Sequence, residues 1–157
     1  MRCFSVLEGA GAPLSEIIEA GAHACGTPIE ALGFQRGEDA PELIVLAPGA
    51  ALPRPCVCRC ALVPDTANAR ALRALTADAA VSYGLSKRCS LTLSSLEPQR
   101  PVLALQREIA TLTGIVLERQ ELPLRPWCNA GPEPLLAAAG TLLLLGVPPE
   151  RLVSGTK

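Results

Sequence analysis

The amino-acid sequence predicts an α/β fold, with a mainly parallel sheet, flanking helices and a small antiparallel strand excursion. Strand and helix signals alternate through the first half of the chain. A strand at residues 57–63, a helix at 67–75 and a strand at 79–83 predict one β-α-β unit, and such units make neighbouring strands parallel. From Ser90 onward, three strand signals follow one another without a helix between them. We expect a single α/β domain over residues 1–157.

The N-terminal part of this domain, residues 1–59, begins with a strand signal at 4–7. A glycine-rich turn follows, and then a helix at 14–24 whose apolar residues share one helical face. An apolar run at 43–46 predicts a buried strand. Three prolines within 48–55 predict a loop, because proline has no amide hydrogen to donate.

The second part, residues 60–153, contains the β-α-β unit and three further strands at 90–96, 102–109 and 115–121. The last two of these are close enough in sequence to form a hairpin. The longest apolar run, 135–147, is too short for a membrane span, which needs about 20 residues. This run predicts a buried helix.

The composition argues against two classes of partner. The net charge of −1 provides no attraction for nucleic acid or for an anionic membrane surface. One Trp, one Tyr and two Phe leave few aromatic faces on which bases could stack. The N-terminal residues lack a signal-peptide pattern, and seven cysteines, an odd number, are typical of reduced thiols. We therefore expect a cytoplasmic protein that binds neither nucleic acid nor membranes.

Three segments carry a resemblance to a known family. Residues 136–150 read LAAAGTLLLLGVPPE. They resemble the helix that closes the central domain of the Mur ligases, written roughly N-x-L-A-A-x-A-x-A-x-x-L-G-V-x-x-E. Residues 61–66, ALVPDT, resemble the family's strand ending in N-x-D-D, and residues 80–86, AVSYGLS, resemble its V-x-T-Y-G-x-S strand. The resemblance covers about residues 60–153 and implies a fold like the Mur ligase central domain.

The family's catalytic features are missing from this sequence. Mur ligases hold ATP with a G-T-x-G-K-T/S loop, and neither Lys87 nor Lys157 follows glycine in that pattern. The D-H-x-D segment is absent, since the only histidine is His23. Ser94 and Ser95 have no His or Lys base nearby in the sequence, so no nucleophile and base pair is evident. We expect a pseudo-enzyme without a cofactor.

The end of the strand at 79–83 is a candidate ligand site. Open α/β sheets bind ligands at the carboxyl ends of their parallel strands. Hydroxyl groups and a flexible glycine there suit a small ligand or a nucleotide sugar, although the same residues also suit a simple strand-to-loop turn. The candidate residues are Asp65, Ser82, Tyr83, Gly84 and Ser86.

A second candidate lies between the first strand and the first helix. Gly9 and Gly11 could present backbone amides to an anion, because a helix N-terminus carries partial positive charge. Pro13 removes one donor, however, and only two glycines match the dinucleotide fingerprint. A tight turn is the alternative interpretation.

Cys56, Cys58 and Cys60 could suggest a metal or redox site. On an extended strand their side chains repeat every 6.5 to 7 Å, roughly, whereas two sulfurs on one zinc lie within about 4.6 Å of each other. A regular strand therefore cannot chelate zinc with neighbouring members of this set. A metal site would need a bend and further ligands, and the simpler interpretation is three small apolar residues facing a core.

These observations favour a non-catalytic binding or interaction protein, linked to cell-wall precursor metabolism by descent alone. The alternatives are a small-ligand or nucleotide-sugar binder near Tyr83, and a cysteine-based metal or redox protein. With 49% hydrophobic and 18% charged residues, the chain is apolar enough that we expect exposed patches. The expected partner is a second copy or another cytosolic protein, bound by the loop at 48–55 or around Pro126, Trp127 and Cys128.

Overall fold

The computed structural model describes residues 2–11, 13–37, 40–97, 99–125, 127 and 131–153. Its strands are β1 (Arg2–Leu7), β2 (Phe34–Arg36), β3 (Leu43–Leu46), β4 (Cys56–Pro64), β5 (Leu75–Tyr83), β6 (Leu91–Ser95), β7 (Val102–Leu105), β8 (Ile109–Ala110), β9 (Val116–Leu117) and β10 (Gln120–Pro123). Its helices are α1 (Leu14–Ala24), the 3-10 helix η1 (Ile29–Leu32), α2 (Ala69–Arg73), α3 (Pro132–Leu145) and α4 (Pro149–Leu152).

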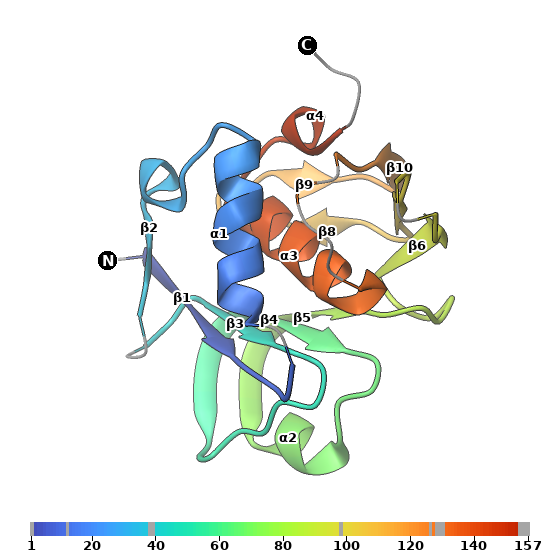
Figure 1. Cartoon of the computed structure of the whole chain (residues 1–157). Helices are drawn as coiled ribbons and strands as arrows, with labels where there is room; N and C mark the ends of the chain where they lie inside the picture. The colour runs from blue at the N-terminus through green and yellow to red at the C-terminus, as the bar shows by residue number, and fades with distance from the viewer. Residues whose placement is uncertain are drawn as a thin grey trace.

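Eight strands form one sheet in the order β10-β7-β6-β5-β4-β3-β1-β2, and β8 pairs with β9 in a separate two-stranded sheet (Figure 1). Neighbouring strands from β2 to β6 are parallel, whereas β7 is antiparallel to both β6 and β10. The prediction of an α/β fold with a mainly parallel sheet, flanking helices and an antiparallel excursion is therefore confirmed. The same sheet runs through both predicted parts of the chain.

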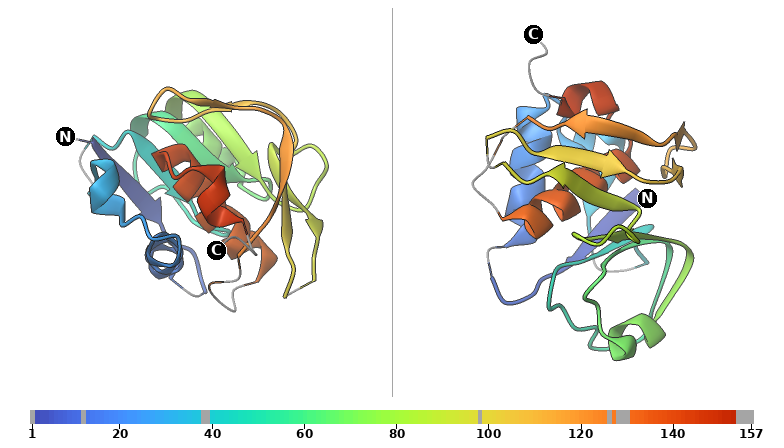
Figure 2. Two further views of the ribbon diagram at one scale, coloured as in Figure 1. Left: turned by 90° about the horizontal axis from the view of Figure 1, so that it is seen from above. Right: turned by 90° about the vertical axis from the view of Figure 1, so that its right-hand side faces the viewer.

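The helical layer consists of α1 and α3, which pack against each other while the sheet curves around α3 (Figure 2). α3 is buried from Leu135 to Leu145, as the apolar run predicts. Gly140 lets α3 approach the sheet closely, because a Cβ there would lie 2.7 Å from Leu91 Cδ1 and 3.1 Å from Leu62 Cδ2. Among the described residues, no helix has the length and apolar character that crossing a membrane requires.

β4 contains an irregularity that bends the sheet. The amides of Arg59 and Cys60 both donate to the carbonyl of Glu42, at 3.1 and 2.9 Å. Two successive amides on one carbonyl are the mark of a β-bulge, which increases local twist and bends the strand. The register of β4 with β5 does not shift at this point, since Cys58 pairs with Ala77 and Cys60 with Ala79, so the irregularity lies on the β3 side of β4. Before this point β4 and β5 extend away from the helical layer, with α2 beside them (Figure 2).

Most predicted elements are confirmed, but the helix predicted at 67–75 is too long. α2 begins after Asn68, whose side chain accepts a hydrogen bond from the Ala71 amide at 2.7 Å, and it ends at Arg73. The alanine-rich residues that follow belong to β5 instead, where they pair with β4 from Leu75 onward. Pairing between strands outweighs the helix propensity of alanine here, because propensity is a weak preference that tertiary contacts override.

The strands predicted at 102–109 and 115–121 are each broken in two. β7 and β10 remain in the main sheet, while β8 and β9 form the tip of the predicted hairpin and leave it. The tip lies against the C-terminal end of α3, where the Leu112 amide donates to the Leu144 carbonyl at 2.9 Å. The three-residue strand β2 was not predicted, because so short a segment gives no periodic signal.

Candidate functional site

The carboxyl ends of β4 and β5 bring together the residues predicted to bind a ligand, but most of them serve the fold. The Tyr83 side chain is fully buried, and its hydroxyl donates to the Leu46 carbonyl. Burial raises the pKa of Tyr83, and the nearby carboxylates Glu133 and Asp65 raise it further. This hydroxyl is therefore used within the chain and is not presented at the edge where the sequence analysis expected a ligand.

The two serines next to Tyr83 order the turn that follows β5. Ser82 Oγ accepts a hydrogen bond from the Ser90 amide at 3.0 Å, and Ser86 Oγ accepts one from the Arg88 amide at 3.2 Å. The Gly84 amide donates to the Leu91 carbonyl at 3.1 Å. These groups form hydrogen bonds within a strand-to-loop turn. A simple turn was the alternative interpretation of this segment of the sequence.

Asp65 is the one predicted ligand-binding residue that remains exposed at this edge. Its amide donates to the Tyr83 carbonyl at 2.8 Å, and its carboxylate lies directly beside the Cα of Gly84. The pKa of Cys89 is raised by burial first, and then by Asp65. A single carboxylate next to a protonated thiol does not form a recognisable catalytic arrangement.

The turn at this edge is also held by two residues that the sequence did not single out. Gln106 Nε2 donates to the carbonyls of Lys87 and Cys89, at 2.9 Å each. Arg107 donates to the Arg88 carbonyl at 2.9 Å. No sequence signal could have identified them, because their partners lie about 20 residues away. The turn is therefore clamped to the start of the antiparallel excursion.

The proposed anion site at Gly9 and Gly11 is filled by the chain itself. The Glu8 carboxylate accepts hydrogen bonds from the amides of Leu14 and Ser15, at 2.7 and 3.0 Å. An acidic side chain at a helix N-terminus occupies the position that an anion would take. A small hollow beside the two glycines is also lined by Glu133, which would repel an anion. The alternative of a tight turn agrees with this geometry.

The cysteines of β4 do not assemble a metal site. Cys58 and Cys60 are buried, and burial raises the pKa of both thiols, that of Cys60 to about 11. Thiols with raised pKa values stay protonated at neutral pH, whereas metal ligation and nucleophilic attack need the thiolate. Among the described residues, no group of three or more His, Cys, Asp or Glu side chains could hold a metal ion.

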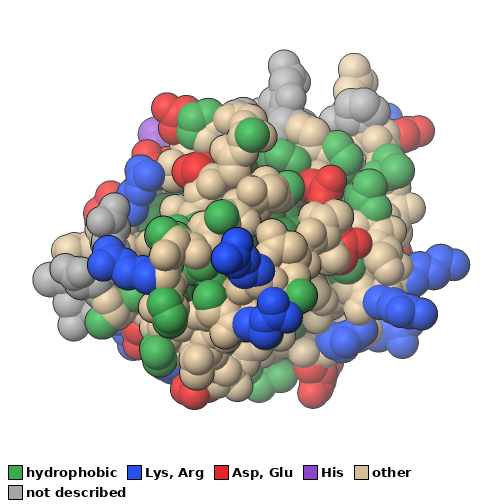
Figure 3. Space-filling view, turned by 90° about the horizontal axis from the view of Figure 1, so that it is seen from below, with side chains coloured by type: hydrophobic (Ala, Val, Ile, Leu, Met, Phe, Trp, Pro, Cys, Tyr) green, Lys and Arg blue, Asp and Glu red, His purple; other side chains and the backbone are tan. Residues whose placement is uncertain are grey.

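The two surfaces predicted to bind a partner differ in exposure: the loop at 48–55 is mostly exposed, whereas Trp127 is not. Seen from below, the face over α2 and the adjoining strands carries apolar side chains scattered among charged ones (Figure 3). Trp127 lies against α1, because a Cβ on Gly21 would be 2.8 Å from its ring, and it is only partly exposed. Trp127 therefore packs against the body of the protein instead of standing free on the surface. Pro126 and Cys128 lie outside the described residues.

A groove between the β8–β9 hairpin and the turn from α3 to α4 was not predicted. We name it the hairpin groove; its volume is about 510 Å³. Ile115 and Val116 lie on it with 60% and 55% of their surfaces exposed. Its residues include Val147 and the carboxylates Glu118 and Glu150. The sequence predicted that Ile115 and Val116 belong to one strand at 115–121, whereas Val116 lies on β9, outside the main sheet.

A second hollow, which we name the α1–η1 pocket, lies between α1, η1 and the first strands. Its volume is about 240 Å³. Buried apolar residues such as Phe4 and Ile29 form part of its lining, and four polar side chains complete it: Glu19, His23, Glu30 and Arg36. Its lining residues come from β1, α1, η1 and β2, whereas the carboxyl edge discussed above belongs to β4 and β5.

No protein-family model matches this sequence, and no curated protein matches it either. The interpretation of function therefore rests on the geometry of the chain and on the resemblance of its sequence segments.

Proposed function

We propose that this protein is a non-catalytic interaction protein that binds a basic, aliphatic segment of another protein in the hairpin groove. The observation that carries the proposal is the pair Ile115 and Val116, which are more than half exposed beside a hollow of about 510 Å³. Exposed apolar side chains clustered at a groove mark interaction sites more often than single ones do.

The hairpin tip is held in place before any partner arrives. The Thr111 amide donates to the Ile115 carbonyl at 2.8 Å, and the Ile115 amide donates back to Thr111 Oγ1 at 3.2 Å. Thr111 and Thr113 share a further hydrogen bond of 3.0 Å between their hydroxyls. A surface that is already ordered loses less conformational entropy on binding.

Charge at the groove indicates the chemistry of the partner. Glu118 and Glu150 belong to the groove and form no ion pair with a described residue. The arginines that follow these two carboxylates in the sequence have other contacts. Arg151 donates to the Cys25 carbonyl at 3.3 Å, and Arg119 lines a separate hollow on the β6–β7–β10 strands. A segment that alternates aliphatic and basic side chains would match both the apolar wall and the carboxylates.

We also propose that the domain descends from a Mur ligase-like central domain. Support comes from where the resembling segments lie: they fall on β4, β5, α3 and α4, and Gly140 of α3 meets Leu62 of β4. The alternative of a nucleotide-sugar binder near Tyr83 has less support, because the Ser82, Tyr83 and Ser86 oxygens all have partners within the chain.

The groove can be tested with two fluorescent dodecapeptides of alternating sequence, one of Lys and Leu and one of Glu and Leu. We expect fluorescence anisotropy to detect binding of the basic peptide only. Glu118→Lys combined with Glu150→Lys should weaken that binding by about tenfold or more, because each lost charge-assisted contact is worth about 1.5–3 kcal/mol. Ile115→Ser should weaken it separately, by removing apolar contact area.

The matched control is Asp78→Lys with Glu97→Lys, which changes the net charge equally at exposed positions outside the groove. Equal affinity of both double variants would show that the peptide follows overall charge, and the groove proposal would be wrong. A dimer detected by sedimentation and abolished by the groove variants would instead identify a second copy of this chain as the occupant.

A separate expectation concerns nucleotide. Calorimetric titration of the protein with ATP and Mg²⁺ should give no heat of specific binding, because the sequence has no glycine-lysine loop to surround the phosphates. The anion position at the start of α1 is taken by Glu8. Low-micromolar affinity that requires Mg²⁺ would contradict the pseudo-enzyme proposal.

A further inference from the structure

We infer that the α1–η1 pocket binds a free α-amino acid with an aliphatic side chain. The pocket is separate from the hairpin groove and shares no residue with it. Its volume of about 240 Å³ suits a molecule of that size, and is small for the drug-sized ligands that fill pockets of roughly 300–1,000 Å³.

The apolar part of the pocket is formed by buried residues. Phe4 of β1, Ala22 of α1 and Ile29 of η1 are 1%, 2% and 6% exposed, and all three line the pocket. These side chains belong to the main core, so their positions are fixed by packing. An aliphatic side chain placed against them would leave water without losing hydrogen bonds.

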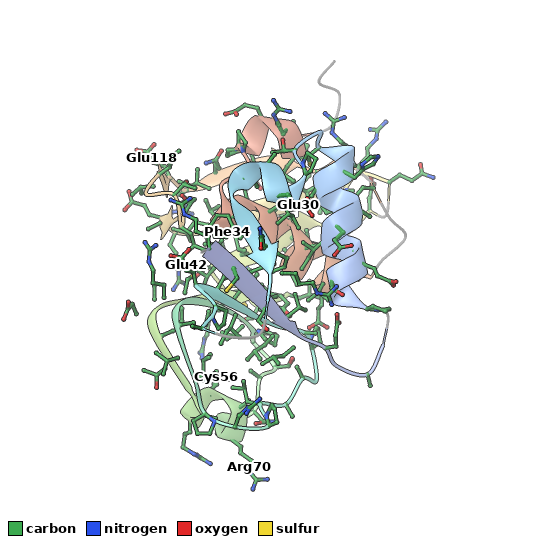
Figure 4. The ribbon with its side chains drawn as sticks, turned by 90° about the vertical axis from the view of Figure 1, so that its left-hand side faces the viewer. Glu30, Phe34, Glu42, Cys56, Arg70 and Glu118 are labelled. Carbon is green, nitrogen blue, oxygen red and sulfur yellow. The ribbon has the colours of Figure 1, made fainter. Side chains whose placement is uncertain are left out.

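The polar part combines both signs of charge at the mouth. Arg36 and Glu19 form an ion pair of 3.5 Å with more than half of each side chain exposed, which leaves most guanidinium donors of Arg36 available. Glu30 forms no ion pair or side-chain hydrogen bond with a described residue. Figure 4 shows Glu30 on η1, in a view that also includes α1. A pure anion or a pure cation would meet a like charge in this pocket.

A zwitterion satisfies these groups together. The carboxylate of an amino acid matches the planar fork of Arg36, since guanidinium groups bind carboxylates through paired hydrogen bonds. Its ammonium group matches the carboxylates of Glu19 and Glu30, which line the same pocket. His23, the only histidine, lines the same pocket and can accept or donate one further hydrogen bond.

The inference can be tested by titrating the full ¹⁵N-labelled chain with L-leucine and recording amide chemical shifts. We expect shifts at Ala22, His23 and Ile29 at millimolar leucine, and none at Ile115 in the hairpin groove. Two matched probes separate the charged ends: 4-methylpentanoate lacks the ammonium group, and 3-methylbutylamine lacks the carboxylate. Both should bind about tenfold or more weakly than leucine, because each has lost one charged contact.

Two variants assign the ends of the ligand to residues. Glu30→Gln should weaken leucine about tenfold without weakening 4-methylpentanoate, while Arg36→Gln should weaken leucine without weakening 3-methylbutylamine. Both positions are exposed, and a surface ion pair contributes little to stability, so both variants should stay folded. Absence of shifts in the pocket at millimolar leucine, or a leucine affinity in both variants equal to that of the unmodified protein, would overturn the inference. Neither result bears on the hairpin groove.

Discussion

Replacing Leu143 with alanine should lower the free energy of unfolding by about 2–5 kcal/mol, the largest stability change expected for this chain. Leu143 is fully buried on α3, where it belongs to the main hydrophobic core and also lines the hairpin groove. Removing its side chain takes away apolar contacts and leaves a cavity that the surrounding helix and strands cannot fill completely. Urea denaturation monitored by circular dichroism gives the midpoint and slope from which this loss is measured.

Two further substitutions test whether the loss in Leu143→Ala comes from the buried position on α3. Leu96→Ala removes the same atoms from a side chain that is 59% exposed, and should change stability by less than about 0.5 kcal/mol. Ala138→Leu adds volume where α3 is fully buried, and should cost about 1–3 kcal/mol by overpacking. Unchanged midpoints for Leu143→Ala and Ala138→Leu would mean that α3 lies at the periphery of the protein.

Gly84→Ala should lower the free energy of unfolding by about 1–3 kcal/mol and expose Cys89 to thiol reagents. Gly84 has a φ of +156°, which disfavours any residue with a Cβ, and that Cβ would also collide with the Asp65 carboxylate. The collision would separate the ends of β4 and β5 at the turn that buries Cys89. Urea denaturation reports the first effect, and the rate of labelling by a disulfide reagent reports the second.

The backbone and steric contributions to the stability loss in Gly84→Ala can be measured separately. Gly114 also has a positive φ, of +90°, but nothing lies within 4 Å of a Cβ there, so Gly114→Ala includes only the backbone part. Asp65→Ala in the Gly84→Ala background should recover some stability, because it removes the colliding carboxylate. If Asp65→Ala gives no recovery, the collision is not what destabilises the variant.

The fold was more predictable than the sites, for a physical reason. Apolar periodicity and glycine or proline breaks are local, so the bounds of α1 and β3 could be predicted from their own residues. The end of α2 depends on the pairing of Leu75 with Cys56, which no local pattern contains. In the same way, the side-chain oxygens of Ser82 and Tyr83 form hydrogen bonds with residues that only the tertiary fold brings near. These two groups, which the sequence suggested as ligand contacts, therefore stabilise the fold instead.

Neither the hairpin groove nor the α1–η1 pocket could be predicted from the sequence. The hairpin groove depends on β8 and β9 leaving the sheet to lie on α3, and the strand pattern gave no reason for that departure. The α1–η1 pocket joins Glu19, Glu30 and Arg36 from three elements. Charged residues in separate amphipathic segments are normally solvated, and only the tertiary arrangement shows that these face one hollow.

The outermost strands limit how copies of this protein can meet. An unpaired strand edge is a template for adding a strand from another molecule, and such addition can continue into filaments. β2 has only three residues and exposes Gln35 and Arg36, while β10 has four and ends at Pro123, which has no amide hydrogen to share. Short, charged or proline-ended edges offer few backbone groups for pairing. These two edges therefore disfavour strand addition between copies, and high concentration should not by itself drive polymerisation through the eight-stranded sheet.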